Sequence, residues 1–287
     1  MCRKFALSSY IIFLTCINVF SQAGKDGSLT VTSNNFVINR YTRVVADIPA
    51  GSSTITVSNI NDLNRDGITY LPAGYTTNSS VYANNALSPG DLIMIYQAQG
   101  AVIDSTNTLN YGTVINYNGA GTYEFAEVAS VSGNTITLGC RTKLSYFASR
   151  YVQVIRVPQY TTLTINSSRS IVPVPWGAPS FGGADPSALT RRRGGVIALH
   201  ATNVVNNGSI SADAAGFRGG TIENNTTSDY SNFNQTQFVT NNSFFSAEKG
   251  ESIAGYRDDY DSLYNGRYGR GAPANGGGGG NSHNAGG

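Results

Sequence analysis

Residues 123–138 read YEFAEVASVSGNTITL, and this stretch decides the class of fold. Residues 122–131, which overlap the first part of this stretch, are a strand candidate with apolar positions at Ala126, Val128 and Val131. A Ser-Gly-Asn turn at 132–134 follows, and residues 135–138 return as a second β-prone run. Two such runs around a short glycine-containing turn predict an antiparallel hairpin.

Further strand candidates lie on both sides of this hairpin. Residues 91–97 read DLIMIYQ, a continuous apolar run opened by the Pro-Gly turn at 89–90. No window of helical length carries a convincing helical period. Short strands with frequent turns predict a β-sandwich or barrel-like domain over residues 27–158. Its other expected strands are residues 29–32, 36–38, 42–48, 53–57 and 151–157.

The second half of the chain has a different sequence pattern. Very short apolar runs alternate with Asn and Gly corners, as in GGVIALHATNVVNNGSIS at 194–211. This rhythm is typical of a parallel β-helix, although the coil period is irregular. We therefore predict an irregular parallel β-helix segment over residues 159–265, with a polar loop inserted at 219–246. The Gly-rich tail, residues 266–287, is predicted to be disordered. The fold class is all-β.

The N-terminus has the order of a secretory signal peptide. Arg3 and Lys4 precede an apolar run over 5–20, and small polar residues follow. We expect residues 1–23 to be this signal peptide. The run is too short for a membrane span, and an uncleaved anchor helix is the alternative. The mature chain is therefore expected to be secreted or at the outer-membrane cell surface, without a membrane span.

Composition excludes several function classes. The net charge is +2, charged residues make up 13%, and no basic helix is present, so we expect no nucleic-acid partner. The sequence has no G-x-S-x-G motif, no zinc ligand set and no phosphate loop. These absences favour a protein that is not an enzyme.

One motif suits a calcium ion. Residues 62–67 read DLNRDG and match the first half of a calcium loop, in which alternate oxygen ligands from Asp62, Asn64 and Asp66 would converge. The EF-hand pattern fails, because Ala73 stands where a bidentate Glu is needed. A looser calcium turn is the hypothesis, and a plain Asx-rich turn is its alternative. We predict no other cofactor.

A charged and aromatic cluster near the C-terminus is the candidate for glycan or partner binding. Carboxylates beside tyrosine rings suit sugar recognition, whereas a solvated polar loop is the alternative. The cluster consists of Tyr256, Arg257, Asp258, Asp259 and Tyr260.

Two further patterns are weaker. The Arg191–Arg193 run is the densest basic stretch. We predict a solvated turn there, with contact to anionic polysaccharide or lipid head groups as the alternative. Ser105 and Ser262 lie in short Asp-Ser sequences that resemble O-glycosylation sites of Bacteroidota.

Several of these stretches in combination resemble the N-terminal region of large secreted adhesin-like, gliding-motility-associated surface proteins of Bacteroidota or myxobacterial type. The resemblance implies that repeats and a C-terminal sorting domain, often for type IX secretion, would follow, so we expect this chain to be a fragment or a truncated frame. The stretches are SPGDLIMIYQAQGA (88–101), YEFAEVASVSGNTITL (123–138), GGVIALHATNVVNNGSISADAAGFRGG (194–220) and GGGGGNSHNAGG (276–287).

These observations lead to three functional hypotheses. The first is a non-catalytic cell-surface protein for adhesion or filament scaffolding, with surface polysaccharide or other cell-surface proteins as partners. The second is a secreted β-helix carbohydrate-active enzyme, a polysaccharide lyase or glycoside hydrolase, that uses Asp213, Asp229 and the 258–261 cluster. The third is a stalk without a ligand of its own.

Overall fold

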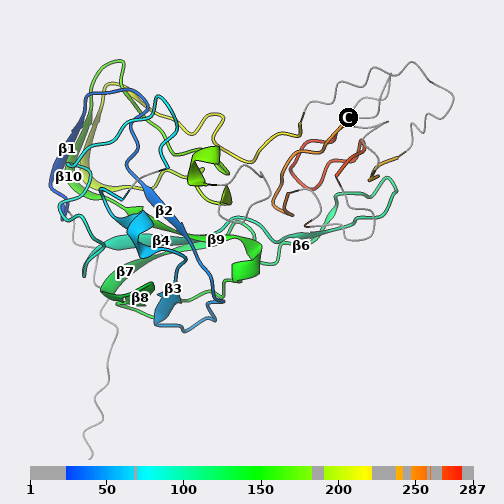
Figure 1. The fold of residues 1–287 in the computed structure, drawn as a ribbon, viewed down its shortest axis with the longest axis horizontal. Coiled ribbons are helices and arrows are strands. Elements are labelled where there is room, and N and C mark those ends of the chain that lie inside the picture. The colour runs from blue at the N-terminus through cyan, green and yellow to red at the C-terminus, as the bar shows by residue number, and fades with distance from the viewer. Residues whose placement is uncertain are drawn as a thin grey trace, which may run out of the picture.

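Strands dominate the described part of the chain, as the all-β prediction requires. The structure, a computed structural model, describes residues 24–67, 70–182, 191–221, 237–241, 247–256, 259 and 267–279. The predicted signal peptide lies outside these ranges. Figure 1 shows a body of sheets on one side and a C-terminal arm, coloured orange to red, on the other. We define the arm as the described residues from 237 to 279, and the body as the described residues from 24 to 221.

The largest sheet has six strands, all antiparallel to their neighbours. Its order is β2 (Arg40–Arg43), β9 (Val152–Val157), β4 (Leu92–Gln97), β7 (Tyr123–Ser132), β8 (Thr135–Leu138) and β3 (Thr54–Thr56). The sheet curls into a half-barrel, and a bridge between Val44 and Val57 joins its two edges. The predicted hairpin is confirmed, with Ser132 opposite Thr135.

Both faces of the central strands are covered, which explains the continuous apolar run in β4. Ile93 and Ile95 point into the half-barrel and are fully buried in its interior core. Leu92 and Met94 point outward into a second core. Four later residues pack against that outer face, namely Val174, Ala178, Phe181 and Ala198. Strands buried on two faces lose the usual polar alternation.

A second unit, which we call the parallel stack, lies beside the half-barrel in Figure 1. Its first sheet pairs β1 (Ser28–Val31), β10 (Gln159–Ile165) and β12 (His200–Asn206) in parallel. Its second pairs β11 (Ser170–Ile171) with β13 (Ser209–Ile210), and a parallel bridge joins Phe36 to Ile171. Successive passes of the chain thus form three stacked rungs.

The domain division expected at residue 158 stays a prediction. β9 ends at Val157 and β10 begins at Gln159, on either side of that position. However, β1 precedes the half-barrel in the sequence and pairs with β10, which follows it. The half-barrel strands therefore lie, in chain order, between the first and second rungs.

The remaining elements are short. β5 (Val102–Ile103) pairs antiparallel with β6 (Val114–Asn116), and β6 runs beside the arm in Figure 1. Three 3-10 helices are η1 (Ile60–Leu63), η2 (Ala148–Arg150) and η3 (Pro179–Phe181). Across the described ranges, no helix is long and apolar enough to cross a membrane.

The prediction of a disordered Gly-rich tail is wrong for residues 267–279. Tyr268 forms antiparallel bridges with Thr240 and Glu248, and the Gly279 N–H donates to the Gly269 carbonyl at 2.9 Å. A Cβ on Gly279 would lie 1.9 Å from the Ala247 carbonyl oxygen. The glycines therefore let backbone pack on backbone, a use of glycine that composition alone did not reveal.

Candidate functional site

The Arg191–Arg193 run is buried, so the prediction of a solvated turn is wrong. Arg192 forms an ion pair with Asp259, and its guanidinium lies 4.0 Å from the Tyr151 ring centroid. Arg193 forms an ion pair with Asp62 of η1. Ion pairing and aromatic stacking together compensate for the loss of hydration.

The three residues of the proposed calcium turn are directed to different partners. Asp62 accepts from Arg193, and Asp66 accepts from Arg65 at 3.0 Å, which lowers the pKa of the Asp66 carboxyl. Asn64 donates its side-chain amide within the loop. Among the residues that the structure describes, no group of three or more His, Cys, Asp and Glu side chains could hold a metal ion. The calcium turn stays a prediction.

Of the cluster predicted to bind a glycan or partner, Tyr256 and Asp259 are described, and they lie together. The Asp259 carboxylate accepts from the Tyr256 backbone N–H at 2.7 Å and from the Tyr151 hydroxyl at 3.0 Å. Burial is the main cause that raises the pKa of Tyr151 to about 12. Because Tyr151 and Arg192 belong to the body, Asp259 joins the arm to the body. Arg257, Asp258, Tyr260 and the glycosylation candidate Ser262 lie outside the described residues.

The other glycosylation candidate, Ser105, is half-buried. It follows Asp104, whose carboxylate accepts from the Thr106 N–H at 2.9 Å and from the Thr106 hydroxyl at 2.6 Å. This is a local Asx turn, and the O-glycosylation of Ser105 stays a prediction.

A second set of contacts extends this junction. The guanidinium of Arg218 lies 4.1 Å from the Tyr256 ring centroid, and its Nε donates to Glu251 at 2.7 Å. The buried Glu251 carboxylate also accepts from Trp176 Nε1 at 2.8 Å and from Gln99 Nε2 at 2.9 Å. Glu251, an arm residue, is therefore held by three side chains of the body.

A groove of about 780 Å³ opens beside this junction, and we call it the glycine-walled groove. Residues from three segments, 216–221, 247–251 and 275–279, line it. Arg218 and Glu251 belong both to the junction and to the groove. The groove therefore lies where the arm meets the segment at 216–221 that follows β13.

The glycines of this groove fall into two kinds. Gly220 and Gly276 pack against backbone, because a Cβ on either would lie within about 3 Å of a carbonyl oxygen. Gly216, Gly219 and Gly277 would meet nothing within 4 Å of an added Cβ. At these three positions no atom lies close to where a side chain would begin, so a ligand can approach the backbone closely, although the Gly277 carbonyl already accepts from the Gly250 N–H at 2.9 Å.

The groove also carries an aromatic ring and carboxylates. Phe217 is half-buried and lies edge-on against Trp176, with centroids 5.5 Å apart. The buried Glu248 accepts from the Thr221 N–H at 2.9 Å and from Arg267 at 3.1 Å. A ring, a guanidinium, carboxylates and peptide groups in one groove suit a ligand with many hydroxyls and few charges.

Sequence reasoning missed this groove. Its lining segments are far apart in the chain, and its main marker is the glycines of the presumed tail. The groove does lie next to the Tyr256–Asp259 cluster that the sequence singled out, because Arg218 stacks on Tyr256. Asp213, a candidate for the enzyme hypothesis, is exposed and does not line the groove, and Asp229 is not among the described residues.

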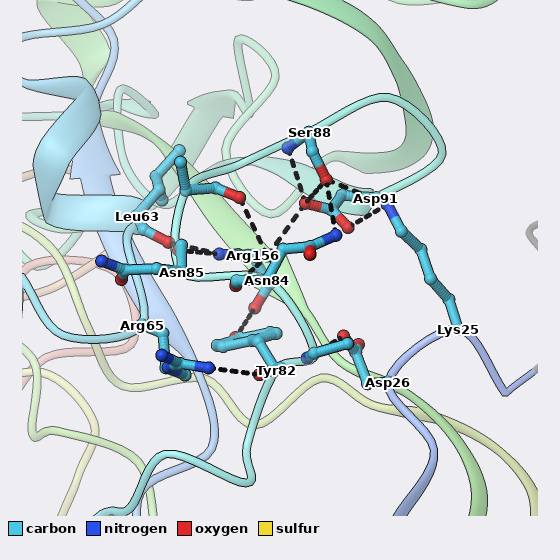
Figure 2. A network of polar contacts seen from close by, with 12 residues as sticks. Lys25, Asp26, Leu63, Arg65, Tyr82, Asn84, Asn85, Ser88, Asp91 and Arg156 are labelled. Carbon is cyan, nitrogen blue, oxygen red and sulfur yellow. Dashed lines mark hydrogen bonds and ion pairs between the residues drawn. The ribbon is translucent and has the colours of Figure 1, made fainter.

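Another polar network, in Figure 2, joins Lys25 and Asp26 to residues of the half-barrel and its loops. The buried Arg156 of β9 donates to the Asn85 carbonyl at 2.8 Å and pairs with Asp91 at 2.9 Å. Lys25 also pairs with Asp91, and the Tyr82 ring centroid lies 4.1 Å from the Arg156 guanidinium. Because the charges of Lys25, Asp91 and Arg156 are paired with one another inside the protein, we assign this network a structural role.

Comparison with known proteins leaves the family open. No family model and no curated protein matches this chain. The tailspike gp54 of Acinetobacter baumannii bacteriophage AP22, solved with A. baumannii capsular saccharide, aligns over 50% of this chain and 21% of its own, with 19% identity and a TM-score of 0.24. The tailspike gp49 of Pseudomonas phage LKA1 aligns over 50% and 19%, with 15% identity and a TM-score of 0.25.

A third similar structure is the tailspike gp61 of Pseudomonas phage phi297. It aligns over 66% of this chain and 26% of its own, with 13% identity and a TM-score of 0.25. This chain thus spans about a quarter or less of each tailspike. TM-scores at this level establish neither a common fold nor a common ligand.

Proposed function

We propose that this chain is a non-catalytic module of an exported cell-surface protein and that it binds polysaccharide in the glycine-walled groove. The combination of glycine backbone beside open space, the Phe217 ring and Arg218 in one groove carries this proposal. Sugar hydroxyls need directional donors and acceptors, while the C–H face of a sugar ring packs on an aromatic side chain.

The sequence resemblance supports the wider role. It implies adhesion or scaffolding of a surface filament, on an all-β exported protein. In this proposal the parallel stack forms the first coils of a β-helix.

Paired alanine variants test the binding site. Phe217→Ala removes the groove ring, whereas Phe125→Ala removes a half-exposed ring on the outer face of β7, outside the groove. Binding is measured by calorimetry on a panel of neutral and acidic capsular-type polysaccharides. We expect Phe217→Ala to weaken binding about tenfold and Phe125→Ala to leave it unchanged. Equal affinity in both variants would contradict the proposal.

A carbohydrate-active enzyme is the second candidate function. Glu248 and Glu251 are both buried and line the same groove, and paired carboxylates are the usual machinery of glycoside hydrolysis. Assays for reducing ends and for unsaturated products on the polysaccharides that bind would decide between the two. Turnover that disappears in Glu248→Gln or Glu251→Gln favours the enzyme, and no turnover on a bound polysaccharide favours the non-catalytic module.

Surface exposure is tested on cells. An antibody against residues 24–160 is used to blot whole cells before and after external protease treatment. Loss of the band on treatment supports a surface protein. A band that survives in intact cells and is cleaved after lysis would contradict it.

A further inference from the structure

The two ends of the parallel stack differ in how far their apolar side chains are exposed. At the first rung, Leu29 and Phe36 are 1% and 2% exposed. Val81 and Tyr82 belong to the same buried core, and Thr76 forms a parallel bridge with Phe36. At the third rung, Val204 is 44% exposed and Ile210 is 41% exposed. One end is therefore covered and the other is open.

The exposed residues of the third rung occupy positions that are buried in the other two. Leu29, Leu163 and Val204 stand in one register, and the first two are 1% and 0% exposed. Ile210 follows Phe36 and Ile171 in the same way on the second sheet. The third rung thus presents core positions to solvent.

The open end also lacks the devices that protect edge strands. β12 reads HATNVVN and β13 reads SI, without Lys, Arg, Asp, Glu or Pro. β12 pairs with β10 along one edge, and no strand in the described part of the chain pairs with its other edge. Such a neutral edge with free N–H and C=O groups is a template for another strand.

We propose that this open end binds an extended polypeptide segment that adds in parallel to β12 and β13 as a fourth rung. The segment has two short uncharged strands joined by a corner, with one aliphatic side chain over Val204 and another over Ile210. Continuity with the existing interface supports this occupant, because two rungs already add in the same direction and register. Main-chain hydrogen bonds supply affinity, and the two aliphatic positions supply register.

A second copy of this chain fits the open end less well. The end that would continue the stack head-to-tail is the first rung, where Leu29 is buried and Thr76 already forms a parallel bridge with Phe36. A two-fold dimer would bring β12 against β12 in antiparallel orientation, opposite to the direction of the stack.

The chain itself offers a probe. A labelled peptide of residues 159–171, QYTTLTINSSRSI, contains β10 and β11, which already pair in parallel with β12 and β13 from the other side. The full chain is incubated with this peptide or a scrambled one, and hydrogen exchange is followed over β12. We expect the native peptide to slow exchange of the β12 amides about tenfold at saturation and the scrambled peptide to have no effect.

Two neighbouring substitutions locate the contact. Val204→Lys places a charge under the added rung and is expected to weaken peptide binding about tenfold or more. Val205 is as exposed as Val204 but points outward in the register with Thr30 and Thr164, so Val205→Lys is the matched control with unchanged binding. Ile210→Lys repeats the test if Val204→Lys lowers the thermal unfolding temperature.

Three outcomes would overturn the proposal. The first is unchanged exchange of β12 in excess peptide. The second is equal loss of binding in the Val204→Lys and Val205→Lys variants. The third is protection of β12 that rises with protein concentration without peptide, which would assign the open end to a second copy.

Discussion

The body and the arm of this molecule fill their interiors with different chemistry. In the body, aliphatic ladders such as Ile95 with Val154 and Leu29 with Leu163 are essentially fully buried. In the arm, buried positions include Glu248, Lys249 and Glu251, each 3% exposed or less. A glycine-rich segment can therefore be ordered by backbone contacts and by hydrogen bonds to charged side chains, where apolar side chains are few.

Lys249 illustrates the arm's interior. Its ammonium group donates to the Phe238 carbonyl at 2.6 Å and to the Gly271 carbonyl, and it lies 4.0 Å from the Tyr111 ring centroid. One cation therefore joins arm segments to each other and to the body. Hydrogen bonds to a buried charge are stronger than neutral ones but costly to lose.

The largest expected effect concerns the place where the body itself buries charge. Arg156→Met removes the guanidinium that donates to backbone carbonyls such as that of Asn85 in Figure 2, and it removes the more buried of the two cations that pair with Asp91. We therefore expect the free energy of unfolding to fall by about 3–5 kcal/mol. Chemical denaturation measures it. Arg141→Met, at an exposed arginine that donates to the Gly51 carbonyl, is the control and should cost less than about 0.5 kcal/mol. Equal effects would contradict the assigned role.

A smaller effect should appear in the arm alone. Gly279→Ala forces a Cβ to 1.9 Å from the Ala247 carbonyl oxygen, whereas Gly277→Ala meets nothing within 4 Å. We expect the first to destabilise the arm by about 1–3 kcal/mol and the second to leave it unchanged. Hydrogen exchange at residues 247–256 reports this local effect, while exchange in β4 and β9 serves as the body's reference. Faster exchange in both variants would mean that glycine packing is not what holds the arm.

The smallest effect is a pH dependence of the body. Burial is the main cause that raises the pKa of Asp26 above its usual 3.8, so the native state holds its proton to higher pH than the unfolded chain does. The stability associated with this group is present below 3.8 and is lost as pH rises through the raised pKa. Asp26→Asn should remove this fall from the pH profile of unfolding. A profile that falls equally in both proteins would assign it to other groups.

Sequence reasoning recovered the local part of the body. The 123–138 hairpin, the β4 run and β9 were predicted because turn chemistry and apolar patterning are local signals. The pairing of β1 with β10 could not be predicted, because it depends on contacts across the whole half-barrel. The burial of Arg191–Arg193 was missed for a similar reason, since Asp62 and Asp259 lie far away in the chain.

The candidate site was predicted only in part. The buried Tyr256 and the exposed Asp259 lie at its border and anchor the arm, while the groove itself is lined largely by glycines and by two glutamates distant in sequence from Arg218. Glycine composition cannot tell a flexible tail from a packed backbone. The distinction depends on which neighbours approach each glycine, as the contrast between Gly277 and Gly279 shows.

Blocking the groove floor tests the central claim most directly. Gly277 lines the groove and an added Cβ there meets nothing within 4 Å, so Gly277→Leu places a side chain at the groove, and Ser130→Leu adds a leucine at an exposed position of β7 as the matched control. Polysaccharide binding is measured by calorimetry after thermal unfolding confirms that both variants are folded. We expect Gly277→Leu to bind polysaccharide about tenfold or more weakly than the wild type, and Ser130→Leu to bind it like the wild type. Wild-type affinity in a folded Gly277→Leu variant would contradict the assignment of the glycine-walled groove as the binding site.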